Sequence, residues 1–106
     1  MSIVWEKIGY NGKRIRLTEV QKRHISFFHP EVLVNQVVLL ETLAMPDMVT
    51  KGGGPKTRLL YKHYVTPVSS KYLAVVIKEL NQEGFIVTSY FTDGIRRAKI
   101  LWKRTD

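Results

Sequence analysis

Two helices are predicted where apolar residues recur every three or four positions. Thr18 is followed three residues later by Gln21, a capping box in which the hydroxyl accepts from a free backbone N–H, so a helix should begin there. The apolar face of this short helix carries Val20, His24, Phe27 and Phe28. Proline is tolerated in a helix's first turn, so His29-Pro30-Glu31 should close one helix and open the next.

The second predicted helix is longer and should pack most deeply on the sheet. Its apolar stripe consists of Leu33, Val37, Leu40 and Ala44, and Val34, Val38 and Leu39 widen the stripe. Glu31 suits the positive end of the helix dipole, and Pro46 should end the helix.

Four closely spaced strands are predicted after the helices, and such spacing implies antiparallel neighbours. They are Thr57 to Val65, Lys71 to Glu79, Phe85 to Thr92 and about Ala98 to Lys103, with turns at Thr66-Pro67-Val68-Ser69, Asn81-Gln82-Glu83-Gly84 and Asp93-Gly94. The strand from Lys71 to Glu79 is apolar on both faces, which marks it as central. The glycine-rich segment from Lys51 to Lys56 is a flexible loop without the Gly-Lys-Ser/Thr of a nucleotide loop.

A hairpin could precede the helices. Ile3 to Tyr10 alternates loosely, Asn11-Gly12 suits a tight turn, and Arg14 to Leu17 could return as a strand. The predicted fold class is therefore α+β, with two N-terminal helices packed on an antiparallel sheet of about four strands. The 106 residues, 44% of them hydrophobic, suit a single domain over positions 1–106.

The charge of the chain indicates which class of partner to expect. The formal net charge is +8 and the sequence pI is about 9.9. Such a balance attracts polyanions, so RNA or DNA is the natural partner, although charge can also serve solubility alone. The cations form short clusters at Lys13-Arg14-Arg16, Lys22-Arg23, and Arg96-Arg97-Lys99 with Lys103-Arg104.

Residue types and patterns that the sequence lacks indicate the expected location and cofactor content of the protein. The chain has no cysteine, no apolar run of the roughly 20 residues that a membrane helix needs, and no signal-peptide pattern at its start, so a cytoplasmic protein without membrane contact is expected. No His-x-x-x-His or Asp-x-Asp spacing occurs, so neither a metal nor another cofactor is expected. The sequence does not indicate an oligomeric state.

Short motifs from Thr18 onward follow one another in a distinctive order. They are Arg23-His24-Ile25, His29-Pro30-Glu31, Glu41 to Asp47, Tyr61-Lys62, Leu73 to Ile77, Ile86 to Tyr90, and Leu101-Trp102. In this order the chain resembles a family of small phage and bacterial proteins assigned to the barnase, EndoU, colicin and RelE nuclease superfamily. The resemblance implies a metal-independent endoribonuclease-like domain, such as a toxin or phage-conflict component, with RNA as substrate and an acidic antitoxin or immunity protein as partner.

The residues suit this chemistry. Cleaving RNA without a metal requires a base, an acid and hydrogen-bond donors for the charge that develops on phosphorus. His24 and His29 are candidates for base and acid near neutral pH. Alternation along the strand Phe85 to Thr92 should point Phe85, Val87 and Phe91 to the core, and Ile86, Thr88 and Tyr90 the other way.

Only one of Tyr61 and Lys62 can share the face of Thr88 and Tyr90, and we favour Lys62 for its charge. The candidate catalytic residues are His24, His29, Lys62, Thr88 and Tyr90. The candidate nucleic-acid contacts are Lys22, Arg23, Tyr61, Arg96 and Arg97.

Each candidate also has a structural interpretation. His24 can be a buried imidazole, His29 a helix cap, and Thr88 and Tyr90 ordinary strand residues, while His63 suits a surface or packing role. The alternative function is therefore a non-catalytic basic module that binds RNA or another protein through the same fold.

Overall fold

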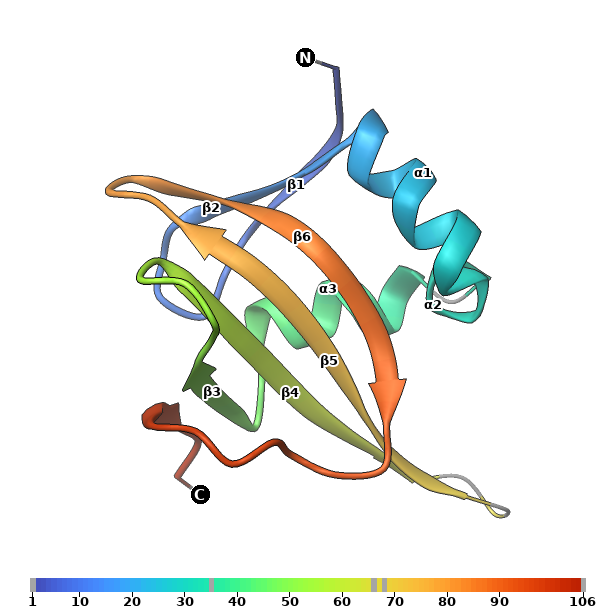
Figure 1. Cartoon of the computed structure of the whole chain (residues 1–106), viewed down its shortest axis with the longest axis vertical. Helices are drawn as coiled ribbons and strands as arrows, with labels where there is room; N and C mark the ends of the chain where they lie inside the picture. Colours follow the sequence, from blue (N-terminus) through green and yellow to red (C-terminus); the bar gives the residue numbers. More distant parts are fainter. Residues whose placement is uncertain (1, 35, 66, 68, 106) are drawn as a thin grey trace.

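The computed structural model describes residues 2–34, 36–65, 67 and 69–105. Within these ranges the chain forms seven strands and three helices (Figure 1). They are β1 (Ile3–Ile8), β2 (Arg14–Thr18), α1 (Glu19–Phe28), α2 (Pro30–Val34), α3 (Gln36–Ala44), β3 (Met48–Lys51), β4 (Thr57–Val65), β5 (Ser70–Glu79), β6 (Glu83–Thr92) and β7 (Ile100–Lys103). The predicted architecture of two helices on about four antiparallel strands is therefore wrong.

All seven strands belong to one mixed sheet, in the order β1-β2-β6-β5-β4-β3-β7. The predicted hairpin exists as β1 and β2, but it joins the main sheet through parallel pairing of β2 with β6, where Arg14 lies opposite Glu83. The short strand β3, which the sequence did not reveal, lies between β4 and β7. The strand predicted as central, now β5, occupies the middle of the sheet.

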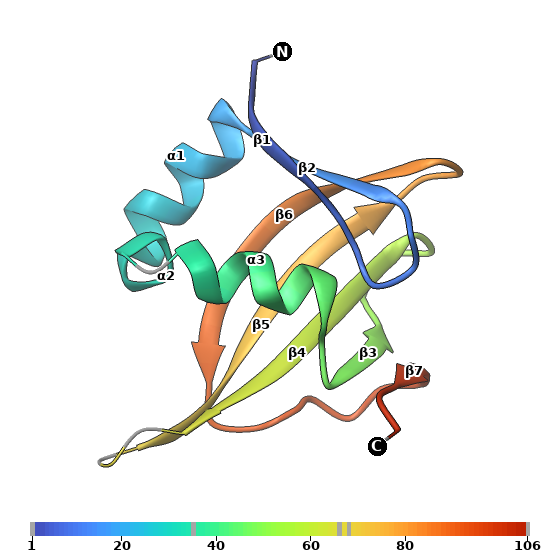
Figure 2. The ribbon, with the colours of Figure 1, turned by 180° about the vertical axis from the view of Figure 1, so that it is seen from behind.

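The main core lies between the helices and one face of the sheet. Figure 2 shows α3 crossing this face, with α1 and α2 near β6. The core contains one or more buried apolar residues from each helix and from β2 to β6: Ile15, Leu17, Ile25, Val32, Leu39, Leu43, Val49, Leu60, Leu73, Val75, Ile77 and Ile86. None of the helices in the described ranges is long and apolar enough to cross a bilayer.

The start of α1 is confirmed, but its predicted apolar face is not. Thr18 caps the helix, and its hydroxyl accepts from the backbone N–H of Gln21 at 3.3 Å. Of the α1 side chains, Ile25 is fully buried, whereas Phe27 and Phe28 are 79% and 59% exposed. The helix rests on the sheet through a narrow contact, so its apolar positions do not coincide with its buried ones.

The predicted second helix is described as α2 and α3, on either side of Asn35, which lies outside the described residues. Its predicted stripe is only partly right. Leu39 is buried and Leu33 and Val38 pack against the core, but Val34 and Val37 are exposed, and the helix buries Thr42 and Leu43 from outside the stripe. Apolar residues occur around most of the circumference of α3, so periodicity alone cannot select the buried face. Thr42 is satisfied in the core by donating to the carbonyl of Val38 at 2.8 Å.

An irregularity in β6 changes the predicted alternation of its side chains. Thr88 lies opposite Val76, but Ile86 lies opposite Ile77, so β6 contains one extra residue at this point. Such a bulge reverses the faces of the residues before it. Ile86 is consequently in the core and Val87 is 39% exposed, the opposite of the prediction, while Thr88 and Tyr90 still share a face.

One of the predicted turns is confirmed, and another lies partly outside the described residues. Gly12 has a φ of +81°, as expected for the Asn11-Gly12 turn. The predicted turn at 66–69 falls partly outside the described residues, since Thr66 and Val68 are not described.

The two ends of the sheet meet where the ring of Tyr10 approaches that of Trp102, with 5.6 Å between centroids. The sheet therefore curves around α3 until its first hairpin touches its last strand.

Tyr64 should make the stability of the main core depend on pH in the alkaline range. Its hydroxyl packs under α3 and donates to the Val38 carbonyl and to Glu41 Oε2, each at 3.2 Å. Burial, with Glu41 nearby, raises the pKa of Tyr64 to about 12 from its ordinary value of 10.0. The unfolded chain therefore ionises this residue first as the pH rises.

The free energy of unfolding is expected to fall as the pH rises from 10.0 to about 12, because the neutral Tyr64 stabilises the fold fully only below the lower of these pKa values. Tyr64→Phe should flatten this part of the decline. Denaturant unfolding at a series of alkaline pH values measures it. Identical pH profiles for the variant and the parent chain would exclude Tyr64 as the cause.

Candidate functional site

The face of the sheet opposite the main core carries a cluster of aromatic side chains, and we call it the open face. Its buried centre consists of Leu59, Tyr61 and Ala74, against which Tyr72, Val76, Tyr90 and Ile95 pack. In the strand register Ala74 lies opposite Tyr61 on one side and Tyr90 on the other. Tyrosines from β4 and β6 thus flank a small residue of β5.

Tyr61 takes the place that was predicted for Lys62. Tyr61 is only 1% exposed, and burial, together with Tyr90, raises its pKa above the ordinary value although Arg96 acts in the opposite direction. Its hydroxyl therefore stays protonated at neutral pH. Lys62 points away and donates from Nζ to the Met45 carbonyl at 2.9 Å. The expected grouping of Lys62 with Thr88 and Tyr90 is wrong, because neighbouring strand residues alternate between faces.

His29 reaches the open face from the junction between α1 and α2. It caps α1, and its backbone N–H donates to the Ile25 carbonyl at 2.7 Å. Its ring lies 5.7 Å from the ring of Tyr90, centroid to centroid, and its side chain remains 34% exposed. This contact is available because β2 pairs with β6 only over residues 83–85, so α1 and α2 lie beside the later part of β6.

The two candidate histidines have different surroundings. His24 is exposed, and its ring contacts Phe28 with 4.9 Å between centroids. Within the described ranges no contact joins it to His29 or Tyr90. Lys22 and Arg23 lie beside it on α1. The structure therefore brings His29, but not His24, to the hydroxyl-bearing strand.

Thr88 shares the open face with Tyr90, as predicted. Its hydroxyl is buried and has no hydrogen-bond partner within the part of the chain that the structure describes. Ser89 points into the core instead and donates to the Ala74 carbonyl at 2.9 Å. The Ser89 hydroxyl is thus satisfied, whereas the buried Thr88 hydroxyl is not.

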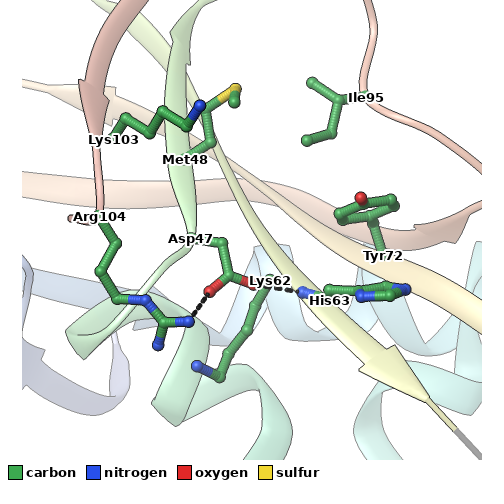
Figure 3. Close-up of a pocket in the computed structure, with 8 residues that line it drawn as sticks. All are labelled: Asp47, Met48, Lys62, His63, Tyr72, Ile95, Lys103 and Arg104. Atoms are coloured by element: carbon green, nitrogen blue, oxygen red, sulfur yellow. Dashed lines mark hydrogen bonds and ion pairs between the residues drawn. The ribbon is translucent and has the colours of Figure 1, made fainter. Parts of the chain in front are cut away.

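A cavity of about 470 Å³ opens where β3, β4 and β7 meet (Figure 3). It is lined by Asp47, Met48, Lys62, His63, Tyr72, Ile95, Lys103 and Arg104. Figure 3 shows Tyr72 and His63 on one side of the cavity and Lys103 and Arg104 across from them. An anion in this space would meet three cationic side chains and a single carboxylate.

Asp47 fixes the geometry of this cavity. One carboxylate oxygen accepts from the backbone N–H of His63 at 2.7 Å, and the other accepts from the Arg104 guanidinium at 2.9 Å. The His63 ring stacks on Tyr72 with centroids 4.7 Å apart and bonds through Nε2 to Ser70. The sequence indicated a surface or packing role for His63, and Asp47 was noted only as the last residue of the Glu41 to Asp47 motif. The sequence signals for this end of the sheet were Lys62 and the basic pair Lys103-Arg104.

Cations without an ion pair border the open face and also occur elsewhere on the molecule. Lys13, Arg14, Arg16, Arg58 and Lys71 pair with Glu6, Glu79, Glu83 or Asp93, whereas Lys7 on β1 and Lys22 and Arg23 on α1 have no ion pair in the described part of the chain. Arg96 and Arg97, on the β6–β7 connection, and Lys103, on β7, have no ion pair within the described ranges. Part of the net charge of +8 thus lies beside the tyrosines of the open face, with Arg96 and Arg97 near Tyr61 and Lys103 near Tyr72.

In the described part of the chain, no three His, Cys, Asp or Glu side chains gather into a group that could hold a metal ion. Comparison of the chain with known protein families, with curated proteins and with solved structures finds no match. The residues of the open face therefore carry the proposal of a function.

Proposed function

We propose that the protein is a metal-independent endoribonuclease-like domain that binds RNA on the open face. The observation that carries the proposal is the contact between His29 and Tyr90, whose rings lie 5.7 Å apart at the edge of β6. The imidazole of His29 thereby lies beside the phenol ring of Tyr90, on a face bordered by Arg96, Arg97 and Lys103. The resemblance to the barnase, EndoU, colicin and RelE superfamily points to the same activity.

The cleavage needs two proton transfers. The ribose 2′-oxygen loses its proton and attacks the adjacent phosphorus, which gives a 2′,3′-cyclic phosphate as the bond to the 5′-oxygen breaks and that oxygen takes a proton. We assign the roles of base and acid to His29 and Tyr90, and their ring contact supports this assignment. The protonated Tyr61 hydroxyl and the neighbouring arginines supply donors for the charge that develops on the phosphate oxygens.

The remaining open face suits binding of a single strand. Tyr72 and Tyr90 are partly exposed, and aromatic rings of this kind stack on bases with little preference for sequence. Arg96, Arg97 and Lys103 surround them with charge for the phosphates. The proposal includes the antitoxin implied by the resemblance, since an acidic partner could cover the same cations.

Labelled single-stranded RNA incubated with the protein in EDTA is expected to be cut, and the products should carry 2′,3′-cyclic phosphate ends. The same strand with 2′-O-methyl groups is the matched control, because it retains the phosphates but lacks the attacking hydroxyl. It should bind and remain intact. Cleavage that requires added metal would contradict the proposed chemistry.

The non-catalytic module remains the second candidate, since the structure does not bring His24 and His29 together. It predicts that both RNAs bind equally, that affinity falls steeply as salt rises, and that neither is cut. Product analysis and a salt titration of the same preparations therefore separate the two functions.

A further inference from the structure

A second cavity, of about 230 Å³, lies between the β3–β4 connection and the β6–β7 connection. It is lined by Thr50, Lys51, Gly52, Gly53, Leu59, Tyr61, Arg96, Arg97 and Ala98. The walls are tied together where the Lys51 N–H donates to the Lys99 carbonyl at 2.9 Å. A Cβ on Gly52 would lie 2.5 Å from Thr57 Cγ2, so a larger residue there would disturb the wall.

Two buried hydroxyl-bearing residues line this cavity. Thr50 and Tyr61 are each 1% exposed. The Thr50 hydroxyl makes no hydrogen bond of good geometry within the described ranges, although it lies close enough to the Tyr61 hydroxyl to lower the pKa of Tyr61. Native proteins leave few buried polar groups without a partner, and such a group calls for an explanation. A ligand that accepts a hydrogen bond would complete the site.

The charged lining of the cavity is entirely positive. Lys51, Arg96 and Arg97 are exposed and form no ion pair in the part of the chain that the structure describes. No aspartate or glutamate lines the cavity. Because guanidinium and ammonium groups only donate, this lining favours an anionic ligand with acceptor oxygens.

We propose that this cavity binds a phosphate group, with Thr50, Tyr61, Arg96 and Arg97 as its donors. The cavity is smaller than the roughly 300–1,000 Å³ of sites for drug-sized ligands, which suits a phosphate and an attached sugar without a base. A tyrosine hydroxyl is protonated at neutral pH, and burial raises the pKa of Tyr61 further, so this group can donate to the ligand. The inference rests on the proposed function only in naming RNA as a source of the phosphate.

Calorimetric titration of the full chain with inorganic phosphate at low ionic strength tests the site directly. Saturable binding is expected, and Thr50→Val or Arg97→Gln should each weaken it about tenfold or more, since each removes a donor to a charged oxygen. Thr42→Val is the matched control, because it removes a buried threonine hydroxyl on α3 that does not line this cavity. Lys7→Gln on β1 controls for net charge. Both controls should bind phosphate as the parent chain does.

Two further ligands identify the source of the phosphate. A dinucleotide with a terminal phosphate and one without it are titrated in competition with inorganic phosphate. Competition by the first alone indicates a free or terminal phosphate, and competition by both indicates a backbone phosphodiester. Either result supports the site if Thr50→Val weakens it.

Absence of saturable phosphate binding, or equal affinity in Thr50→Val, Arg97→Gln and the parent chain, overturns the inference. If Thr50→Val does not fold, Tyr61→Phe provides the same test of a lost hydroxyl donor. RNA cleavage without phosphate binding would overturn this inference alone. Phosphate binding without RNA cleavage would instead contradict the proposed enzyme and leave the phosphate site standing.

Discussion

Replacing His29 with alanine is expected to slow RNA cleavage by about 10²- to 10⁴-fold, the usual contribution of one general acid or base. His29 is the histidine whose ring contacts Tyr90, and one proton transfer would lose its donor or acceptor. The measurement is the single-turnover rate on labelled RNA in EDTA, with enzyme in excess. RNA affinity should change little, because the loss falls on the chemical step.

His24→Ala is the matched control for this experiment. It removes the same group from the same helical region, but the His24 ring contacts Phe28 and not the open face. Its cleavage rate should equal that of the parent chain. A large loss in His24→Ala with normal cleavage by His29→Ala would contradict the placement of the site beside Tyr90. Because His29 also caps α1, thermal unfolding of each variant shows whether a slow rate reflects lost structure.

Leu43→Ala is expected to lower the free energy of unfolding by about 2 to 5 kcal/mol, since it removes buried methyl groups and leaves a cavity. Leu43 is fully buried between α3 and the sheet. Its carbonyl also accepts from the backbone N–H of Tyr10 at 2.8 Å, so this turn of α3 holds the first hairpin. Urea unfolding followed by circular dichroism measures the loss.

Val37→Ala distinguishes burial from helix propensity in the same element. Val37 lies on α3 but is 62% exposed, so removing its methyl groups costs little packing. Alanine also has the higher helix propensity, and the variant should be as stable as the parent chain or slightly more stable. Equal destabilisation by the two substitutions would show that the described buried face of α3 is wrong.

Features set by neighbouring residues were predictable from the sequence. The Thr18 cap and the Asn11-Gly12 turn depend on local backbone geometry, and both are confirmed. The central position of β5 followed from its apolar residues on both faces. These signals need no knowledge of what packs against them.

Features set by distant residues were not predictable. The pairing of β2 with β6 joins segments that carry no mutual pattern, and β3 is too short to give a periodic signal. On α3 the apolar residues surround the helix, so the buried face depends on where the sheet lies. The number of strands and the sheet type were consequently wrong.

In the candidate site, too, the features that depend on neighbouring residues were predictable and those that depend on distant residues were not. Thr88 and Tyr90 were assigned to one face correctly because they lie on the same side of the bulge in β6. The choice between Tyr61 and Lys62 required the strand register, and charge favoured the wrong one. The approach of His29 to Tyr90 depends on how far β2 extends along β6, which no local pattern encodes.

The parallel pairing of β2 with β6 also constrains the order in which the chain can fold during synthesis. Arg14 finds its partner Glu83 only after 69 further residues have been made. Until then Ile15 and Leu17, which are 1% and 0% exposed in the finished fold, lack the strand beside which they become buried. A nascent chain therefore carries an undocked apolar hairpin until residues 83–85 have been made, and during that interval the hairpin is exposed to aggregation.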